Sequence, residues 1–198
     1  MARSRVLDSK NQIIDVAFSI VDKDGADDLS TRRIAKELKV STMTLYNYVQ
    51  NVEEIKKEVL IKGVNILFAS IYEKMRNCDF NDANGGGRMA AYCRAYAYAL
   101  FEFAGKHKSI TRYMIGEGKT HYVNEAELRP FYHSFDVFYN KRGLSQEESA
   151  DIEKKCKMFQ WMVLSMIHEY IDNIYNMSEE EVKECINLYI SKMLCSEQ

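Results

Sequence analysis

Apolar residues recur every three or four positions along most of this 198-residue chain. The repeat is unbroken from Ile55 to Ile71, and similar repeats return in the C-terminal half. Alternating apolar and polar runs bounded by turn residues, which would predict strands, do not occur in the sequence. The pattern therefore predicts an all-α protein. Its predicted helices span residues 8–23, 31–38, 42–49, 51 to beyond 71, 89–105, 107–115, 122–141, 146–173 and 179–194.

Residues 31–38 and 42–49 predict two short helices joined by a tight turn. Either Ser30 or Thr31 is placed to cap the first helix, and Ser41 is placed to cap the second. Two helices joined in this way form a helix-turn-helix, whose second helix enters the major groove of DNA.

Positive charge is concentrated in this part of the chain. The window from 29 to 50 holds Arg32, Arg33, Lys36 and Lys39 against Glu37, which gives 4 − 1 = +3, whereas the whole chain has a net charge of −2. A local cationic patch on an acidic chain is what phosphate binding at one site requires.

The run STRRIAKELKVSTMTLYNYVQNVEEI at residues 30–55 resembles the DNA-binding motif of the TetR family of transcription regulators. The resemblance extends over about residues 7–67. It implies an N-terminal helix-turn-helix domain at 7–67, with its recognition unit at 30–49. It also implies a larger helical domain at 68–198 for effector binding and dimerisation.

Two positions depart from the pattern of that family. Lys39 stands in the turn where the family usually has glycine, so a left-handed backbone there would be strained. Val52 stands where the family often has a lysine that contacts phosphate. The adjacent Asn51 and Glu54 predict a capped helix start, whose N–H groups could meet a phosphate instead.

Side chains around the turn are the predicted DNA contacts. Met43 could read only a thymine methyl group, and Asn47 could pair with adenine. Structural alternatives stay open for Tyr48, which could pack against the first helix, and for Met43, which could shield apolar surface. Base edges are assigned to Thr42, Met43, Thr44 and Asn47, and phosphates to Thr31, Arg32, Tyr46, Tyr48 and, more weakly, Lys36.

Composition agrees with a folded protein, since 46% of the residues are hydrophobic and 28% are charged. The basic N-terminus lacks the apolar segment of a signal peptide, and no stretch reaches about 18 apolar residues. We therefore expect a cytoplasmic protein without a membrane partner. Reduced thiols are expected at Cys78, Cys93, Cys156, Cys185 and Cys195.

The last two predicted helices carry apolar residues that step by four and three positions. Such a seam packs against another helix, either inside one chain or across a dimer interface. In the family that the chain resembles, the last two helices of each subunit form a four-helix bundle at the dimer interface. The predicted interface residues are Ile152, Phe159, Val163, Met166, Tyr170, Ile186, Tyr189 and Met193.

The C-terminal domain is also rich in aromatic residues and methionine. These residues could form ordinary core or line a ligand pocket. Acidic residues nearby, Glu102, Glu117 and Glu169, would suit an aromatic or cationic lipophile. The predicted pocket residues are Tyr92, Tyr96, Phe103, Met114, Phe131, Phe135, Met158, Trp161, Met162 and His168.

Signals for catalysis or metal binding are weak. His168 and Asp172 lie four residues apart on one predicted helix, but no third ligand is indicated. The sequence contains no dinucleotide fingerprint and no nucleophile elbow. We expect neither an enzyme nor a protein with a cofactor or metal.

The sequence thus predicts a homodimeric repressor that binds a palindromic operator in double-stranded DNA and is released by a small hydrophobic or aromatic effector. Two alternatives remain. One is a DNA-binding regulator without a ligand, and the other is a helical protein whose helix-turn-helix is only structural.

Overall fold

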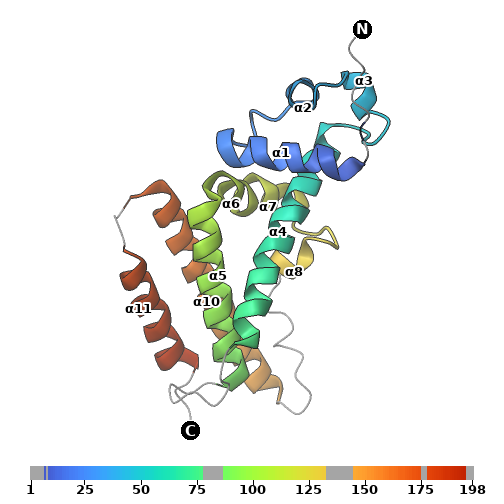
Figure 1. The fold of residues 1–198 in the computed structure, drawn as a ribbon. Helices are drawn as coiled ribbons and strands as arrows, with labels where there is room; N and C mark the ends of the chain where they lie inside the picture. The colour runs from blue at the N-terminus through green and yellow to red at the C-terminus, as the bar shows by residue number, and fades with distance from the viewer. Residues whose placement is uncertain (1–6, 8, 78–86, 133–144, 175–177, 195–198) are drawn as a thin grey trace. The chain divides into compact units, whose positions relative to one another are not determined.

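A computed structural model describes residues 7, 9–77, 87–132, 145–174 and 178–194 of the chain. Every regular element within these residues is a helix, so the predicted all-α class is confirmed (Figure 1). The elements are α1 (Lys10–Asp24), α2 (Thr31–Leu38), α3 (Thr42–Leu45), α4 (Val52–Arg76), α5 (Gly87–Lys106), α6 (Lys108–Ile115), α7 (Glu117–Tyr122), α8 (Arg129–Tyr132), α10 (Gln146–Asp172), α11 (Glu179–Tyr189) and a π-helical turn, η1 (Ile190–Leu194).

The chain divides into two compact units. The first contains Met1–Asn65 and His107–Leu128, and the second contains Ile66–Lys106 and Arg129–Gln198. Helix α4 begins in the first unit and ends in the second. The first unit therefore includes α6 and α7, which the division made from the sequence assigned to the C-terminal domain.

The first unit is built on α1. Its apolar residues at helical spacing, among them Ile13, Ala17, Phe18 and Val21, are all buried, as the pattern predicted. Helix α1 packs against α2 and α6, and α6 packs against α7. The helix ends at Asp24, and the following Gly25 has a φ of 97°, which is open to glycine but strained for other residues. This core supports α2 and α3.

The second unit is built on α5, which packs against α10, α11 and η1. The predicted starts of α10 and α11 are confirmed, because Ser145 with Glu148 and Ser178 with Glu181 both form complete capping boxes.

Two predicted helices are wrong in extent. The helix predicted at 42–49 ends at Leu45, because the next amides form shorter-range bonds, such as Tyr48 N–H to the Leu45 carbonyl at 2.9 Å. The helix predicted at 122–141 does not run through 123–128. Pro130 explains this, since proline is tolerated in the first turn of a helix such as α8 but not in a helix interior.

Candidate functional site

The first unit presents a capped helix-turn-helix made of α2, the turn at 39–41 and α3. The hydroxyl oxygen of Ser30 accepts the Arg33 N–H at 3.2 Å, and that of Ser41 accepts the Thr44 N–H at 3.1 Å. Each cap satisfies a backbone donor that the helix itself leaves unpaired. Leu45 is fully buried, so the apolar side of the motif is anchored in the unit.

Lys39 closes α2 in the left-handed backbone conformation, with φ 58° and ψ 41°. Its N–H donates to the Lys36 carbonyl at 3.2 Å, and the Val40 N–H donates to the Ala35 carbonyl at 3.0 Å. This geometry usually ends on glycine. The predicted strain at Lys39 is therefore present.

The predicted DNA contacts form the outer side of this motif. Met43 is 73% exposed and Tyr46 is 48% exposed, although both are large and partly apolar. Two large exposed side chains therefore lie on the outer side of the motif. The other exposed residues among the predicted DNA contacts are Arg32, Lys36 and Asn47. The half-buried ones are Thr31, Thr42, Thr44 and Tyr48.

Some of these side chains have partners within the chain. The Tyr48 hydroxyl donates to the Leu7 carbonyl at 2.6 Å, and Leu7 lies just before α1. The Thr44 hydroxyl lies 2.9 Å from the Ser41 hydroxyl oxygen. The hydroxyls of Thr31 and Tyr46 lie 3.5 Å apart, which is too long for a strong bond and leaves both able to meet a phosphate.

The cations of the patch are not equivalent. The Arg33 guanidinium pairs with the Asp24 carboxylate and lies 3.9 Å from that of Asp28, so its charge is balanced within the unit. Arg32, Lys36 and Lys39 form no ion pair with any part of the chain that the structure describes. The count of +3 from the sequence therefore includes one arginine that is already neutralised.

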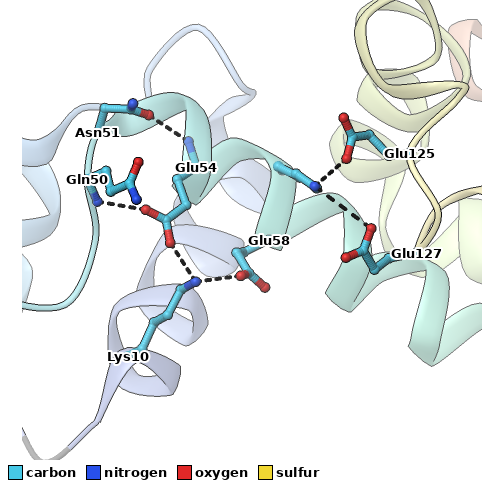
Figure 2. A network of polar contacts seen from close by, with 8 residues as sticks. Lys10, Gln50, Asn51, Glu54, Glu58, Glu125 and Glu127 are labelled. Atoms are coloured by element: carbon cyan, nitrogen blue, oxygen red, sulfur yellow. Dashed lines mark hydrogen bonds and ion pairs between the residues drawn. The ribbon is translucent and has the colours of Figure 1, made fainter.

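The N-terminus of α4 is occupied by a carboxylate (Figure 2). Glu54 accepts the Gln50 N–H at 2.6 Å, and its own N–H donates to the Asn51 side chain at 2.9 Å. The predicted cap is thus formed, but Glu54 reaches one residue further back than a capping box does. A phosphate approaching this end would meet a negative charge, which removes the favourable site that the N-terminus alone would offer.

Glu54 also ties α4 to α1. The Lys10 ammonium lies 2.7 Å from Glu54 and 2.5 Å from Glu58 (Figure 2). The Gln50 N–H, followed by Lys10, lowers the pKa of Glu54, and the bonds to Glu54 and Glu58 raise the pKa of Lys10. A second lysine of α4, Lys57, pairs with Glu125 and lies 3.8 Å from Glu127, and the bond to Glu125 raises its pKa. These pairs fix the start of α4 within the first unit.

The predicted pocket residues are divided between the two units. Met114 belongs to the first unit, and the others that the structure describes belong to the second. Phe135 lies outside the described residues. Tyr96, Phe103, Met114 and Phe131 are buried, Tyr92 and Met162 are half-buried, and Met158, Trp161 and His168 are exposed on α10.

The second unit contains a cavity of about 380 Å³ between α5, α10 and α11. Its lining residues differ from those predicted as a pocket. The spacing of Tyr98, Phe101 and Glu102 at i, i+3 and i+4 on α5 was a signal visible in the sequence, because it places them on one face. The described lining consists of Tyr98, Phe101, Glu102, Tyr170, Glu179, Val182 and Lys183.

The apolar seam of α10 and α11 faces the interior of the second unit. Phe159, Val163 and Ile186 are fully buried within the single chain, as the core alternative requires. Ile152, Met166, Tyr170 and Tyr189 are half-buried, and Met193 lies in η1.

A different face of α10 meets solvent. Trp161 is 65% exposed and Met158 is 47% exposed. Trp161 lies two residues from both Phe159 and Val163, which on a helix means about 200° away, on the side opposite the core. The exposed face of α10 thus carries a large aromatic residue and a methionine at its surface.

Within the described ranges, no group of three histidine, cysteine or acidic side chains is arranged to hold a metal ion. No described helix is long and apolar enough to span a bilayer.

Comparisons with known proteins add a relative and a related fold. No family model matches the chain. Over 164 residues, which are 71% of this chain and 83% of the relative, the sequence is 22% identical to the uncharacterized HTH-type transcriptional regulator YobS of Bacillus subtilis (strain 168). A solved structure of a protein with unknown function from Rhodococcus sp. RHA1 matches with a TM-score of 0.68 and 18% identity, covering 93% of this chain and 94% of that one. The chain is thus similar in sequence to a helix-turn-helix regulator and shares its fold with the Rhodococcus protein.

Proposed function

We propose that this chain is a sequence-specific DNA-binding transcriptional regulator of the TetR type. The observation that carries the proposal is the helix-turn-helix of α2 and α3, whose apolar side is buried while Arg32, Met43, Tyr46 and Asn47 are exposed. A helix-turn-helix with only a structural role has no need for an exposed face of this composition. The relative named as an HTH-type transcriptional regulator supports the same conclusion.

Within this proposal, α3 reads bases and α2 positions the protein on the phosphate backbone. Thr42 and Met43 face the base edges from the second helix of the motif, and Asn47 does so from the turn that follows it. Arg32 and Lys36, which have no described ion-pair partner, bind phosphates. Tyr48 is not included, since its hydroxyl already donates to Leu7.

We further propose that the protein acts as a homodimer on a palindromic operator. A helix-turn-helix that reads two half-sites about 34–36 Å apart requires a two-fold axis between two copies. The exposed face of α10, with Met158 and Trp161, is the surface that we assign to the second copy. Burying these two side chains would remove apolar area from water, which favours association.

We also propose that the protein represses transcription and that a small effector relieves this repression. The cavity between α5, α10 and α11 is within the volume range of ligand sites. Helix α4 runs as one helix from the first unit into the second, so a ligand that favours one position of its C-terminal half can act on the reading helices. A coupling of about 1–3 kcal/mol would be ordinary for such a regulator.

Selection from random duplex DNA tests the proposal directly. We expect the purified protein to enrich one palindrome, with half-sites at least one helical turn apart. On that operator, Arg32→Ala should weaken binding about tenfold and reduce the slope of log affinity against log salt by about one.

Arg33→Ala is the matched control, because it removes the same charge from the neighbouring position of α2. Since Arg33 is paired with Asp24, this variant should bind the operator much more tightly than Arg32→Ala does. Absence of any enriched sequence, or full operator binding by Arg32→Ala, would contradict the proposal. An equal loss of operator affinity in both variants would indicate that Arg32 acts only through its positive charge and not through a specific phosphate contact.

A further inference from the structure

We infer that the cavity between α5, α10 and α11 binds a lipophilic cation with an aromatic body. The inference deepens the proposed function, on which it rests only for the role of this ligand as effector. Binding itself follows from the walls of the cavity and from the charges at its rim, all of which lie within the second unit.

Aromatic rings form much of the cavity wall. Phe101 and Tyr170 meet edge to face, with ring centroids 5.6 Å apart. The Tyr98 hydroxyl donates to the Asn187 side chain of α11 at 3.0 Å, which holds this ring in a fixed direction. Buried Val182 adds an aliphatic contact. Ring faces held in this way stack on flat apolar ligands and attract positive charge.

A glycine leaves room for one of these rings. A Cβ atom added at Gly105 would lie 3.2 Å from the hydroxyl oxygen of Tyr170, which is closer than most Cβ contacts in proteins. Glycine at this position of α5 therefore allows the phenol of Tyr170 to lie against the helix.

The charged groups at the cavity favour a cation. Two carboxylates, Glu102 and Glu179, and one ammonium, Lys183, belong to the lining. Glu102 is engaged by Lys74 at 2.7 Å. Glu179 is only loosely paired, since Lys183 lies 3.9 Å away and the pair is exposed. A pair of this kind contributes little, so a bound cation can replace Lys183 as the partner of Glu179.

A matched pair of hydrophobic ions separates charge from shape. Tetraphenylphosphonium and tetraphenylborate have nearly the same size and form but opposite charge. In isothermal titration of the full-length protein without DNA, we expect one phosphonium ion to bind per chain. Its affinity should exceed that of borate at least tenfold, or about 1.4 kcal/mol.

Two variants locate the binding at this cavity. Phe101→Leu keeps apolar volume but removes the ring face, and should weaken phosphonium binding about tenfold. Glu179→Gln should weaken it about threefold or more, because the exposed carboxylate is lost. Glu180→Gln is the control, since it removes the same charge from the same turn of α11 but does not line the cavity.

The inference is overturned if neither ion binds, if borate binds as tightly as phosphonium, or if Phe101→Leu binds like the wild type while keeping its thermal unfolding temperature. Equal losses in Glu179→Gln and Glu180→Gln would also overturn it, because they would indicate diffuse attraction. A protein that selects an operator but binds no phosphonium retains the proposed function and loses only this inference. A protein that binds phosphonium but selects no operator retains this inference and loses the proposed function.

Discussion

Lys39 occupies the backbone conformation in which helices commonly end on glycine. A residue with a Cβ atom costs about 1 kcal/mol or more in this conformation, and the chain bears that cost at the turn of its helix-turn-helix. The side chain is exposed and forms no described ion pair. The strained turn thus carries one more cation next to α3, which under the proposed function would lie near the phosphates of DNA.

Two substitutions of Lys39 distinguish the effect of backbone strain on stability from the effect of the charge. Lys39→Gly should raise the free energy of unfolding by about 0.5–1 kcal/mol, because glycine adopts the left-handed conformation without a steric cost. Urea unfolding followed by circular dichroism measures the change. Lys39→Ala, which removes the charge but keeps the Cβ atom, should show no such gain. A gain of equal size in both variants would contradict the backbone explanation.

For single residues, features that depend on close neighbours in the sequence were predictable, whereas contacts with residues further along the chain were not. The left-handed position of Lys39 followed from its alignment with a family glycine, and the Ser41 cap followed from its place before α3. The bond from Tyr48 to Leu7 joins residues that lie 41 positions apart, so no local pattern could reveal it. The pairing of Arg33 with Asp24 was hidden for the same reason.

Among the elements, helix starts were predicted better than helix interiors. The caps at Ser145 and Ser178 depend on residues three positions apart, which the sequence displays directly. The prediction of one helix over 122–141 is wrong, because Pro130 is compatible with the first turn of α8 but not with a helix interior. A proline thus overrides the apolar repeat on either side of it.

The start of α4 should depend on pH through Glu54. Its pKa is lowered by the Gln50 N–H and by Lys10, so its stabilisation is complete above the ordinary value of 4.5 and is lost as pH falls through the lower folded pKa. Glu54→Gln should therefore lower the free energy of unfolding by about 1 kcal/mol at pH 7. The gap to wild type should narrow as pH falls through the lowered pKa of Glu54, where the wild-type side chain becomes protonated as well.

Glu37→Gln provides the comparison for this experiment. Glu37 is exposed on α2 and has no polar partner among the described residues, so its loss should change stability little at any pH tested. Urea unfolding at pH 7 and at a series of lower pH values that runs well below 4.5 measures both variants. A difference between Glu54→Gln and wild type that persists unchanged at the lowest pH would rule out the carboxylate as its source.

For the whole molecule, the pattern of apolar residues located a packed seam but not its partner. Heptad spacing indicates that one helix packs on another, and it is identical for a core and for a dimer interface. In the structure, Phe159 and Val163 are covered by their own chain whereas Trp161 is exposed. The sequence showed the face of α5 that lines the cavity but not the residues of α10 and α11 opposite it, because the chain brings these three helices together only on folding.

The dimer proposed through the exposed face of α10 predicts a strong effect at its centre. Trp161→Glu should raise the dimer dissociation constant at least about tenfold, because it replaces an aromatic contact by two buried like charges. Sedimentation equilibrium measures the constant. Tyr72→Glu is the control, since Tyr72 on α4 is equally exposed, at 65%. Equal association of the Trp161→Glu variant and the wild type would exclude this face as the interface.

Trp161 is the single tryptophan of the sequence and lies on the solvent side of α10. Its fluorescence therefore comes from one place in the molecule and responds to whether that place is wet or dry. A blue shift of the emission with rising protein concentration would report pairing of two copies, without any label. At fixed concentration, the same signal would follow whether DNA or a ligand tightens or loosens the pair.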